Sequence, residues 1–228
     1  LVDADYSQIE LRVLAHISGD EIMKKAFLDG VDIHTVTASQ VFNQPIEWVT
    51  PDLRSKAKAV NFGIVYGIGA FSLSKDIGVS VPKASEYIRS YLSKYSGIAH
   101  YMEQTVAKAK RDGYVETMFG RRRYIKELAA KNKNLQAFGE RVAKNTPIQG
   151  TAADIIKIAM IKVYNRLEES GLDARLILQV HDELIVEAKE DCAEKVALLL
   201  KEEMENAVKL TVPMTVDVNT GKTWYDTH

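Results

Sequence analysis

Cysteine is almost absent from the sequence, since Cys192 is the only one among 228 residues. A single cysteine excludes an internal disulfide framework and a cysteine-rich zinc site, and it is compatible with a reducing compartment. Hydrophobic runs are also short, because none approaches the roughly 20 residues that a membrane-spanning helix needs. The first residues, LVDADYSQIE, contain neither a basic leader nor an apolar signal segment. We therefore expect a cytoplasmic protein without a membrane partner.

An excess of charge of one sign is missing too. Thirty basic and 31 acidic residues leave a net charge of −1, whereas a nucleic-acid-binding domain is often strongly basic. Basic residues do cluster locally, at Lys108, Lys110 and Arg111 and again at 121–123. Such runs are more often solvated surface than a binding site. Function must therefore be inferred from individual side chains in particular places.

Hydrophobic residues make up 46% of the chain, enough to form one sizeable core or two small ones. An initiator methionine is lacking, and the sequence enters directly into the pattern of a buried strand. We expect the chain to be part of a larger protein with upstream domains.

Periodicity and capping signals predict the first elements of the fold. Residues 1–6 are expected to form a buried strand. Ser7 and Glu10 have capping-box spacing ahead of an amphipathic helix that ends near Ser18. A second helix is expected to begin where Thr50 precedes a proline and to end at Gly67.

The remaining pattern adds more helices and two hairpins. Helices are expected at 82–94, at 97–112, from after Pro147 to about residue 169, and at 190–208. A short hairpin is expected from YVETM and RRRYI, and a longer one from ARLILQV and ELIVEA. A last strand is expected at TVPMTVDV. A strand followed by many helices and then strands favours an α+β fold with a helical insertion over a regular βαβ array.

Two carboxylates stand where packing alone would not put them. Asp5 ends the first apolar strand, and Asp182 lies at the tip of the longer hairpin. If these strands are neighbours in one sheet, the carboxylates come close together and repel each other unless cations lie between them. Magnesium prefers such hard oxygen ligands, and two-metal phosphoryl transfer requires them. Taken singly, an aspartate at a strand end is usually a turn or cap residue.

The helix after residue 51 carries a second unusual pattern. Arg54, Lys58, Phe62 and Tyr66 recur every four residues and lie on one slowly winding face. A guanidinium and an ammonium one turn apart can bind a triphosphate, and two aromatic rings further along can stack on a base. Glycines at 63 and 67 weaken a helix but permit close approach of a flat ligand. The alternative is an ordinary surface helix whose aromatic side chains reach into the core.

These residues carry a resemblance to a known family. DYSQIELR at 5–12, the Arg54 to Gly67 pattern and VHDE at 180–183 resemble, in order and separation, the three signature motifs of family A DNA polymerases. The resemblance extends over 1–228, includes NTPIQGTAADIIK at 145–157, and is closest to bacterial members of the family. Two positions depart from the common pattern, Ser55 and Gly69, and neither touches the proposed chemistry.

The resemblance implies the following fold and partners. An antiparallel-sheet palm is expected at 1–30 and 131–228 and a mostly helical fingers insertion at 31–130, with the thumb absent from this chain. The parent protein would supply the thumb and exonuclease domains and act as a monomer in DNA replication and repair. Its partners would be primer-template DNA and deoxynucleoside triphosphates.

The resemblance also implies catalytic roles. Asp5 and Asp182, with the backbone carbonyl of Tyr6, would ligate two magnesium ions, and Glu183 would support them. The triphosphate would be bound by residues at four positions, namely Gln8, His34, Arg54 and Lys58. Lys58 would also protonate the leaving group. Without the resemblance, His34 is simply a histidine on the surface of a helix.

Further roles concern the sugar and the duplex. Glu10 would pack under the sugar and exclude a ribose 2′-hydroxyl, a role compatible with capping. In the family, phenylalanine at the position of Phe62 is found in enzymes that discriminate against dideoxynucleotides. Tyr66 would stack at the template position and leave it as the fingers close. The minor groove of the primer-template would be contacted by polar side chains, namely Arg141, Asn145, Gln149 and His181.

Two other classes of protein stay open at this point. Paired carboxylates also serve a nuclease or phosphatase, although the triphosphate-binding pattern and Glu10 argue against hydrolysis. A non-catalytic DNA-binding module that kept the fold is the other alternative, and the presence of both Asp5 and Asp182 argues against it.

Overall fold

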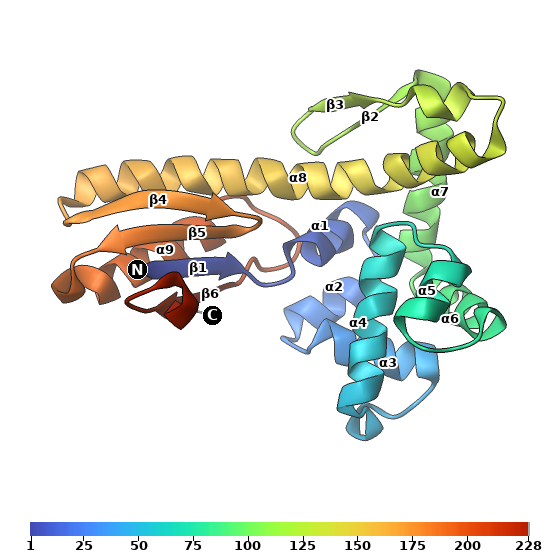
Figure 1. Cartoon of the computed structure of the whole chain (residues 1–228), viewed down its shortest axis with the longest axis horizontal. Helices are drawn as coiled ribbons and strands as arrows, with labels where there is room; N and C mark the ends of the chain where they lie inside the picture. The colour runs from blue at the N-terminus through green and yellow to red at the C-terminus, as the bar shows by residue number, and fades with distance from the viewer. Residues whose placement is uncertain (228) are drawn as a thin grey trace. The chain divides into compact units, whose positions relative to one another are not determined.

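The computed structural model describes residues 1–227 and is rich in helices, with one small antiparallel sheet and a separate hairpin (Figure 1). The α-helices are α1 Ile9–Ser18, α2 Glu21–Leu28, α3 Ile33–Phe42, α4 Pro51–Val65, α5 Ala70–Asp76, α6 Val81–Lys94, α7 Ser96–Asp112, α8 Lys133–Ser170 and α9 Ala193–Glu205. The strands are β1 Val2–Tyr6, β2 Tyr114–Glu116, β3 Arg122–Tyr124, β4 Ala174–Val180, β5 Glu183–Ala188 and β6 Val216–Thr220. Short 3₁₀ turns occupy Ile46–Trp48, Lys126–Ala129, Glu190–Cys192 and Trp224–Thr227. In the described part of the chain, every helix is too short or too polar to cross a membrane.

The chain folds into two compact units. The sheet unit comprises Leu1–Glu10 and the chain from Ala152 onward, and the helical unit comprises Leu11–Thr151. The palm and fingers bounds expected at residues 30 and 130 stay a prediction. The first part of α8 packs within the helical unit, because Ala143 belongs to a buried cluster with residues of α7 and the chain around the β2–β3 hairpin.

The sheet unit is built around β1. Its four strands are ordered β4-β5-β1-β6, and every neighbouring pair is antiparallel. β1 is short but almost wholly buried, because it has a hydrogen-bonded neighbour on each side. The Tyr6 hydroxyl donates to the carbonyl of Met204 in α9 at 2.6 Å, which ties the helix to the strand. The expected α+β class and the expected neighbourhood of the first strand and the hairpin are confirmed.

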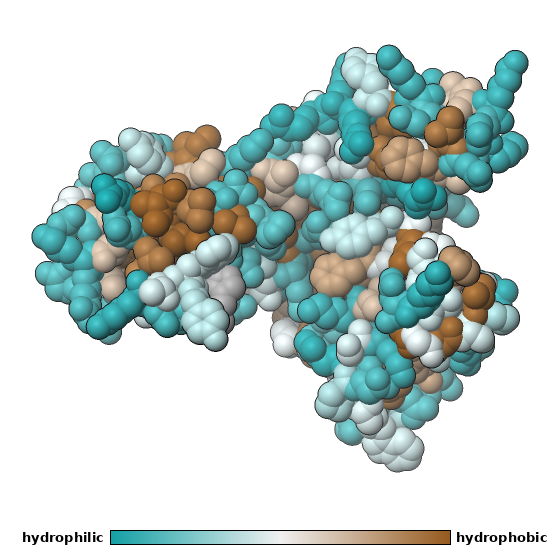
Figure 2. Space-filling view, viewed as in Figure 1, coloured by the Kyte–Doolittle hydropathy of each residue, from teal (hydrophilic) through white to brown (hydrophobic). Residues whose placement is uncertain are grey.

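β4 forms one edge of the sheet. Its pairing with β5 shifts register between Leu176 and Leu178, as a β-bulge does. Ile177 and Leu178 are 47% and 45% exposed. Figure 2 shows hydrophobic residues gathered on the surface of the sheet unit near this edge.

Local signals correctly predict several elements of the helical unit. Thr50 caps α4 by accepting a hydrogen bond from the amide of Leu53, as its position before a proline indicates. Gly113 ends α7 with φ of 79° in the left-handed region, where glycine is favoured. Hairpin β2–β3 forms between the segments expected to pair.

Tertiary packing moves the bounds of α8. The helix was expected to start after Pro147, but it begins at Lys133 and carries the proline inside. Proline removes one hydrogen bond and strains the preceding turn. Ala143 and Ile148 on either side are fully buried, and this packing holds the helix together across the proline.

Three other predicted bounds also change. The last strand was expected at 211–218 but begins at Val216, where its pairing with Tyr6 at the end of β1 begins. The final helix was expected at 190–208, whereas α9 follows a short 3₁₀ turn. The residue directly before α1 is Gln8, not Ser7, and it has a φ of 57°, so the helix starts later than the capping-box alignment predicts.

Candidate functional site

The β4–β5 hairpin places Asp182 in a tight turn. Val180 pairs with Glu183, so the turn consists of His181 and Asp182. His181 has a φ of 48°, a left-handed conformation that non-glycine residues adopt infrequently. The amide of Tyr6 donates to the carbonyl oxygen of Asp182 at 3.3 Å. The turn is therefore attached to the end of β1, where Asp5 lies.

Asp5 lies in a row of carboxylates across the sheet. In register it faces Glu183 on β5 and Asp217 on β6. Side chains directly opposite each other in an antiparallel sheet lie on the same face, as do residues two apart in one strand. Asp3 therefore shares the face of Asp5, and its Oδ2 accepts a hydrogen bond from the Thr227 hydroxyl at 3.2 Å. We call Asp5, Asp182, Glu183 and Asp217 the acidic row.

The acidic row disfavours negative charge on Asp5. Asp5 is the exposed residue of β1, and its partial burial, followed by the charges of Asp182, Glu183, Asp3 and Asp217, raises its pKa to about 6. Burial is also the largest influence that raises the pKa of Asp182. All four charged groups that act on Asp5 are acidic, so the row accumulates negative charge that a nearby cation would stabilise.

The donors of the row suit a hard divalent cation. Carboxylate and backbone carbonyl oxygens are the ligands that magnesium prefers. Within residues 1–227, however, no group of three or more His, Cys, Asp or Glu side chains is arranged to hold a metal ion. A cation at Asp5 and Asp182 would need additional oxygens, and phosphate groups and water can supply them.

Two further residues of the sheet unit follow β1. Gln8 occupies the left-handed position between β1 and α1. Glu10 lies in the first turn of α1 and is half-buried. Both were expected to contact a nucleotide, and that role stays a prediction.

The helical unit carries the second predicted group of residues. Arg54 and Lys58 are exposed on α4, Phe62 is half-buried, and Tyr66 at the end of the helix is 41% exposed. The rings of Phe62 and Tyr66 are stacked, with centroids 6.1 Å apart and an interplanar angle of 17°. The surface of α4 thus combines two cations with two parallel aromatic rings.

Arg54 is engaged by Asp32. Its Nε donates to Oδ2 at 2.7 Å and its Nη2 to Oδ1 at 3.0 Å. Asp32 also caps α3 by accepting hydrogen bonds from Thr35. Burial would raise the pKa of Asp32, but the hydrogen bonds from Arg54 and Thr35 lower it to about 2. The guanidinium is therefore oriented by an ionised carboxylate, a contact that the sequence did not indicate.

His34 is a buried residue of α3, not the surface histidine that its local sequence predicts. It is 2% exposed, its Nδ1 lies 3.1 Å from Nδ2 of Asn61, and its ring centroid is 5.9 Å from that of Phe62. Burial lowers the pKa of His34 to about 4. The positive charges of Arg54 and Lys58 also lower this pKa, whereas the charge of Asp32 raises it. The imidazole is therefore neutral at physiological pH.

This burial predicts a pH dependence of stability. His34 takes up a proton near pH 6.5 in the unfolded chain but only near pH 4 in the folded chain, so the unfolded state binds more protons between these values and stability falls as the pH falls. The full loss is about 3 kcal/mol. We expect chemical denaturation at several pH values to show this component in the native chain and not in His34→Gln. Parallel stability curves for the two proteins from pH 7 to 4 would contradict the assignment.

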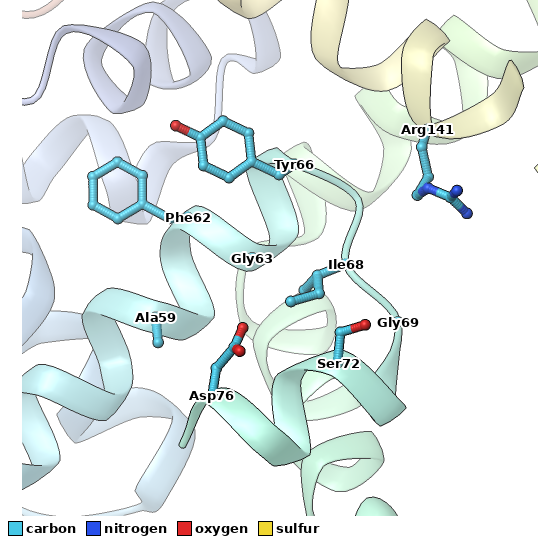
Figure 3. A pocket seen from close by; sticks show the side chains of 9 residues that line it. All are labelled: Ala59, Phe62, Gly63, Tyr66, Ile68, Gly69, Ser72, Asp76 and Arg141. Atoms are coloured by element: carbon cyan, nitrogen blue, oxygen red, sulfur yellow. The ribbon is translucent and has the colours of Figure 1, made fainter. Parts of the chain in front are cut away.

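A cavity of about 590 Å³ adjoins Tyr66. It lies between α4 and α5, and Figure 3 shows Ser72 and Asp76 of α5 and Arg141 of α8 among its lining side chains. Gly63 of α4 and Gly67, which follows the end of that helix, have a packing role here. A Cβ on Gly63 would lie 2.5 Å from Ile68, and one on Gly67, whose φ is 66°, would lie 3.1 Å from Arg141. These glycines thus permit close packing within the helical unit, a reason other than the expected approach of a flat ligand.

The predicted duplex-binding residues are divided between the two units. Arg141, Asn145 and Gln149 recur every four residues on α8 and lie on one face of that helix within the helical unit. Oδ1 of Asn145 is buried and has no hydrogen-bond partner among the described residues. His181 belongs to the sheet unit.

Sequence reasoning missed some of these neighbours. Asp217 faces Asp5 only because of the register of β6, and Asp32 meets Arg54 from another helix. Neither relationship has a signal in the local sequence. An acidic row on a sheet and a cationic helix face are the two kinds of site that metal-dependent phosphate chemistry uses.

Comparison with known proteins identifies the class of protein that has an acidic row on a sheet and a cationic helix face. The sequence model of DNA polymerase family A matches residues 1–226, and the chain belongs to that family. Among curated relatives, DNA polymerase I of Caldicellulosiruptor bescii is 53% identical over 227 residues, a match covering 100% of this chain and 27% of the relative. DNA polymerase I of Pseudomonas aeruginosa is 49% identical over 228 residues, covering 100% of this chain and 25% of the relative.

A solved structure agrees with this assignment. The POL domain of Pol1 from M. smegmatis, in complex with DNA primer-template and dNTP, superposes with a TM-score of 0.94 at 42% identity. The match covers 99% of this chain and 40% of that one. The chain spans about a quarter of the length of the two curated relatives described.

Proposed function

We propose that this chain is the palm and fingers portion of a template-directed DNA polymerase, which adds deoxynucleotides to a primer 3′-hydroxyl. The observation that carries the proposal is the acidic row around Asp5, within a chain of DNA polymerase family A. The similarity to a domain described in complex with primer-template and dNTP supports DNA and nucleotide as partners.

We assign the chemical step to the sheet unit. Asp5, Asp182 and the carbonyl of Tyr6 would hold two magnesium ions, and Glu183 would support this arrangement. When bound, these ions lower the pKa of the primer 3′-hydroxyl and neutralise the departing pyrophosphate. The raised pKa of Asp5 supports the assignment, because carboxylates that repel one another are stabilised by a cation.

We assign triphosphate binding mainly to the helical unit. Arg54 would bind phosphate oxygens with a guanidinium that Asp32 orients. Lys58 would contribute an ammonium group that also protonates the leaving group. His34 would donate a hydrogen bond to phosphate from a neutral imidazole. In the sheet unit, Gln8 is assigned to phosphate and Glu10 to the sugar, where it excludes the ribose 2′-hydroxyl. With phenylalanine at position 62, we expect the enzyme to discriminate against dideoxynucleotides.

We assign the template and duplex to the remaining residues. Tyr66, exposed beside the cavity, would stack at the template position and leave it during closure. Arg141, Asn145, Gln149 and His181 would contact minor-groove acceptors, which are nearly alike for every base pair. Binding of this kind is independent of sequence.

The function is tested with a primed template and one labelled deoxynucleotide. Incorporation of the label opposite its complement, and not of the corresponding ribonucleotide, supports the proposal. Shortening of the primer without incorporation would instead identify a nuclease, the second class that paired carboxylates serve. Binding without either reaction would identify a non-catalytic module.

We propose further that the parent protein is a cytoplasmic monomer in replication and repair, with thumb and exonuclease domains upstream. The 228 residues alone are then expected to be weakly active and poorly processive at physiological salt, because much of the affinity for DNA comes from salt-sensitive phosphate contacts. Primer extension at increasing salt, with products separated by length, checks this. Long products at physiological salt from this chain alone would refute it.

A further inference from the structure

Four buried side chains form a hydrogen-bonded chain that ends at His34. The Tyr95 hydroxyl lies 3.0 Å from Oγ1 of Thr37, which lies 3.1 Å from Oδ1 of Asn61, and Nδ2 of Asn61 lies 3.1 Å from Nδ1 of His34. His34 is 2% exposed, and the other three residues have no exposed surface. We call this set the histidine relay. It joins α3 and α4 to Tyr95, which lies between α6 and α7.

The donors of the relay run in one direction. Thr37 has a single hydroxyl hydrogen and uses it toward Oδ1 of Asn61, so the shared bond with Tyr95 must be donated by the tyrosine. Burial raises the pKa of Tyr95 to about 12, which keeps the phenol protonated as a donor. Asn61 then presents its NH₂ group to Nδ1 of His34, and that nitrogen must accept.

The opposite direction is disfavoured. It would require the Asn61 amide to turn around and the Tyr95 hydroxyl to accept from Thr37 instead of donating. Within residues 1–227 Thr37 is the hydrogen-bond partner of that hydroxyl, so its hydrogen would be buried without an acceptor. A buried hydrogen-bond donor without an acceptor keeps the full cost of its lost hydration. The observed direction avoids this cost and leaves the imidazole proton on Nε2.

We propose that Asn61 is a positioning residue that holds His34 in the Nε2–H tautomer, as a neutral hydrogen-bond donor to the phosphate oxygens of a nucleotide. The proposal rests on the assignment of His34 to triphosphate binding. Arg54 and Lys58 act electrostatically on the same imidazole, so a third cation beside them would be repelled. A neutral donor with a fixed tautomer adds a hydrogen bond to phosphate without adding to this repulsion.

The tautomer can be measured without any nucleotide. In the chain labelled with ¹⁵N-histidine, we expect NMR at neutral pH to show His34 with an unprotonated Nδ1 and a protonated Nε2. In Thr37→Val, which keeps the side-chain shape but removes the hydroxyl that orients Asn61, we expect a mixture of tautomers. In Asn61→Asp, the carboxylate should draw a proton onto Nδ1. Observation of the Nδ1–H tautomer in the native chain would overturn the proposal.

Nucleotide binding provides the second measurement. We expect Thr37→Val and His34→Ala each to weaken dATP binding, measured by calorimetry on this chain, by roughly tenfold for one hydrogen bond. His34→Gln, whose Nε2 amide can still donate, should bind more tightly than His34→Ala. Tyr91→Phe is the matched control. Tyr91 is fully buried with its ring beside that of Tyr95, and its hydroxyl has no hydrogen-bond partner among the described residues, so this variant should keep both tautomer and affinity.

The two measurements separate the relay from the proposed function. The Nε2–H tautomer together with unchanged dATP affinity in His34→Ala would refute the role of His34 in triphosphate binding, and with it the positioning role of Asn61. Weakened affinity in His34→Ala with an unaltered single tautomer in Thr37→Val and Asn61→Asp would refute the positioning role alone.

Discussion

Replacement of Asp182 by alanine is expected to abolish deoxynucleotide incorporation while leaving the affinity for primer-template DNA nearly unchanged. The expected loss is roughly 10³-fold or more, because a catalytic metal site contributes several kcal/mol of transition-state stabilisation. DNA affinity is spared because it depends on positive and polar groups elsewhere. Single-nucleotide incorporation and a fluorescence binding assay on the same protein sample measure the two quantities.

Asp173 provides the matched control for this substitution. It lies just before β4, at the other end of the same hairpin, and is 68% exposed with an ion pair to Lys189 at 2.6 Å. Asp173→Ala should leave incorporation close to that of the native chain, because exposed ion pairs contribute little. If Asp182→Ala retained activity comparable to that of Asp173→Ala, the acidic row could not be the catalytic centre.

Replacement of Lys58 by alanine is expected to lower kcat/KM for deoxynucleotide incorporation by roughly 10²-fold or more, since both a phosphate contact and a proton donor are lost. Lys58→Arg separates the two contributions. The guanidinium keeps the positive charge but does not release a proton near neutral pH, so KM should stay near the native value while kcat falls. Steady-state kinetics with a varied deoxynucleotide distinguishes the two parameters.

Lys56 is the matched control on the same helix. It pairs with Asp52 at 2.6 Å one turn earlier in α4 and lies outside the face that carries Arg54 and Lys58. Lys56→Ala should change kcat/KM by less than about threefold, because a surface pair contributes at most about 1 kcal/mol. Equal losses in both lysine variants would indicate a general electrostatic effect and not a specific role of Lys58.

Local chemistry explains why much of the fold can be predicted from the sequence. Thr50 before a proline, Gly113 after an amphipathic segment and the His181–Asp182 turn between two apolar strands each specify a helix start, a helix end or a hairpin through short-range interactions. The spacing of Arg54, Lys58, Phe62 and Tyr66 likewise predicts one helix face. Such signals need no knowledge of distant contacts.

Errors arose where distant packing overrides a local rule. Pro147 is a helix breaker by itself, but the buried residues on either side keep α8 continuous. His34 has the sequence context of a surface residue, yet it is buried beside Asn61 because α3 packs against α4. A prediction from neighbours in sequence cannot include these contacts.

Periodicity, capping and residue type are sufficient to predict the α+β class, most of the helices and hairpins, and the carboxylates and cations worth testing, while the resemblance of three motifs indicates the family. The contact of Asp217 with the acidic row, the pairing of Asp32 with Arg54, and the hydrogen bonds that link Thr37 and Asn61 to His34 exist only in the folded chain. Strand register and helix packing bring these residues together, and both result from contacts between segments far apart in the chain.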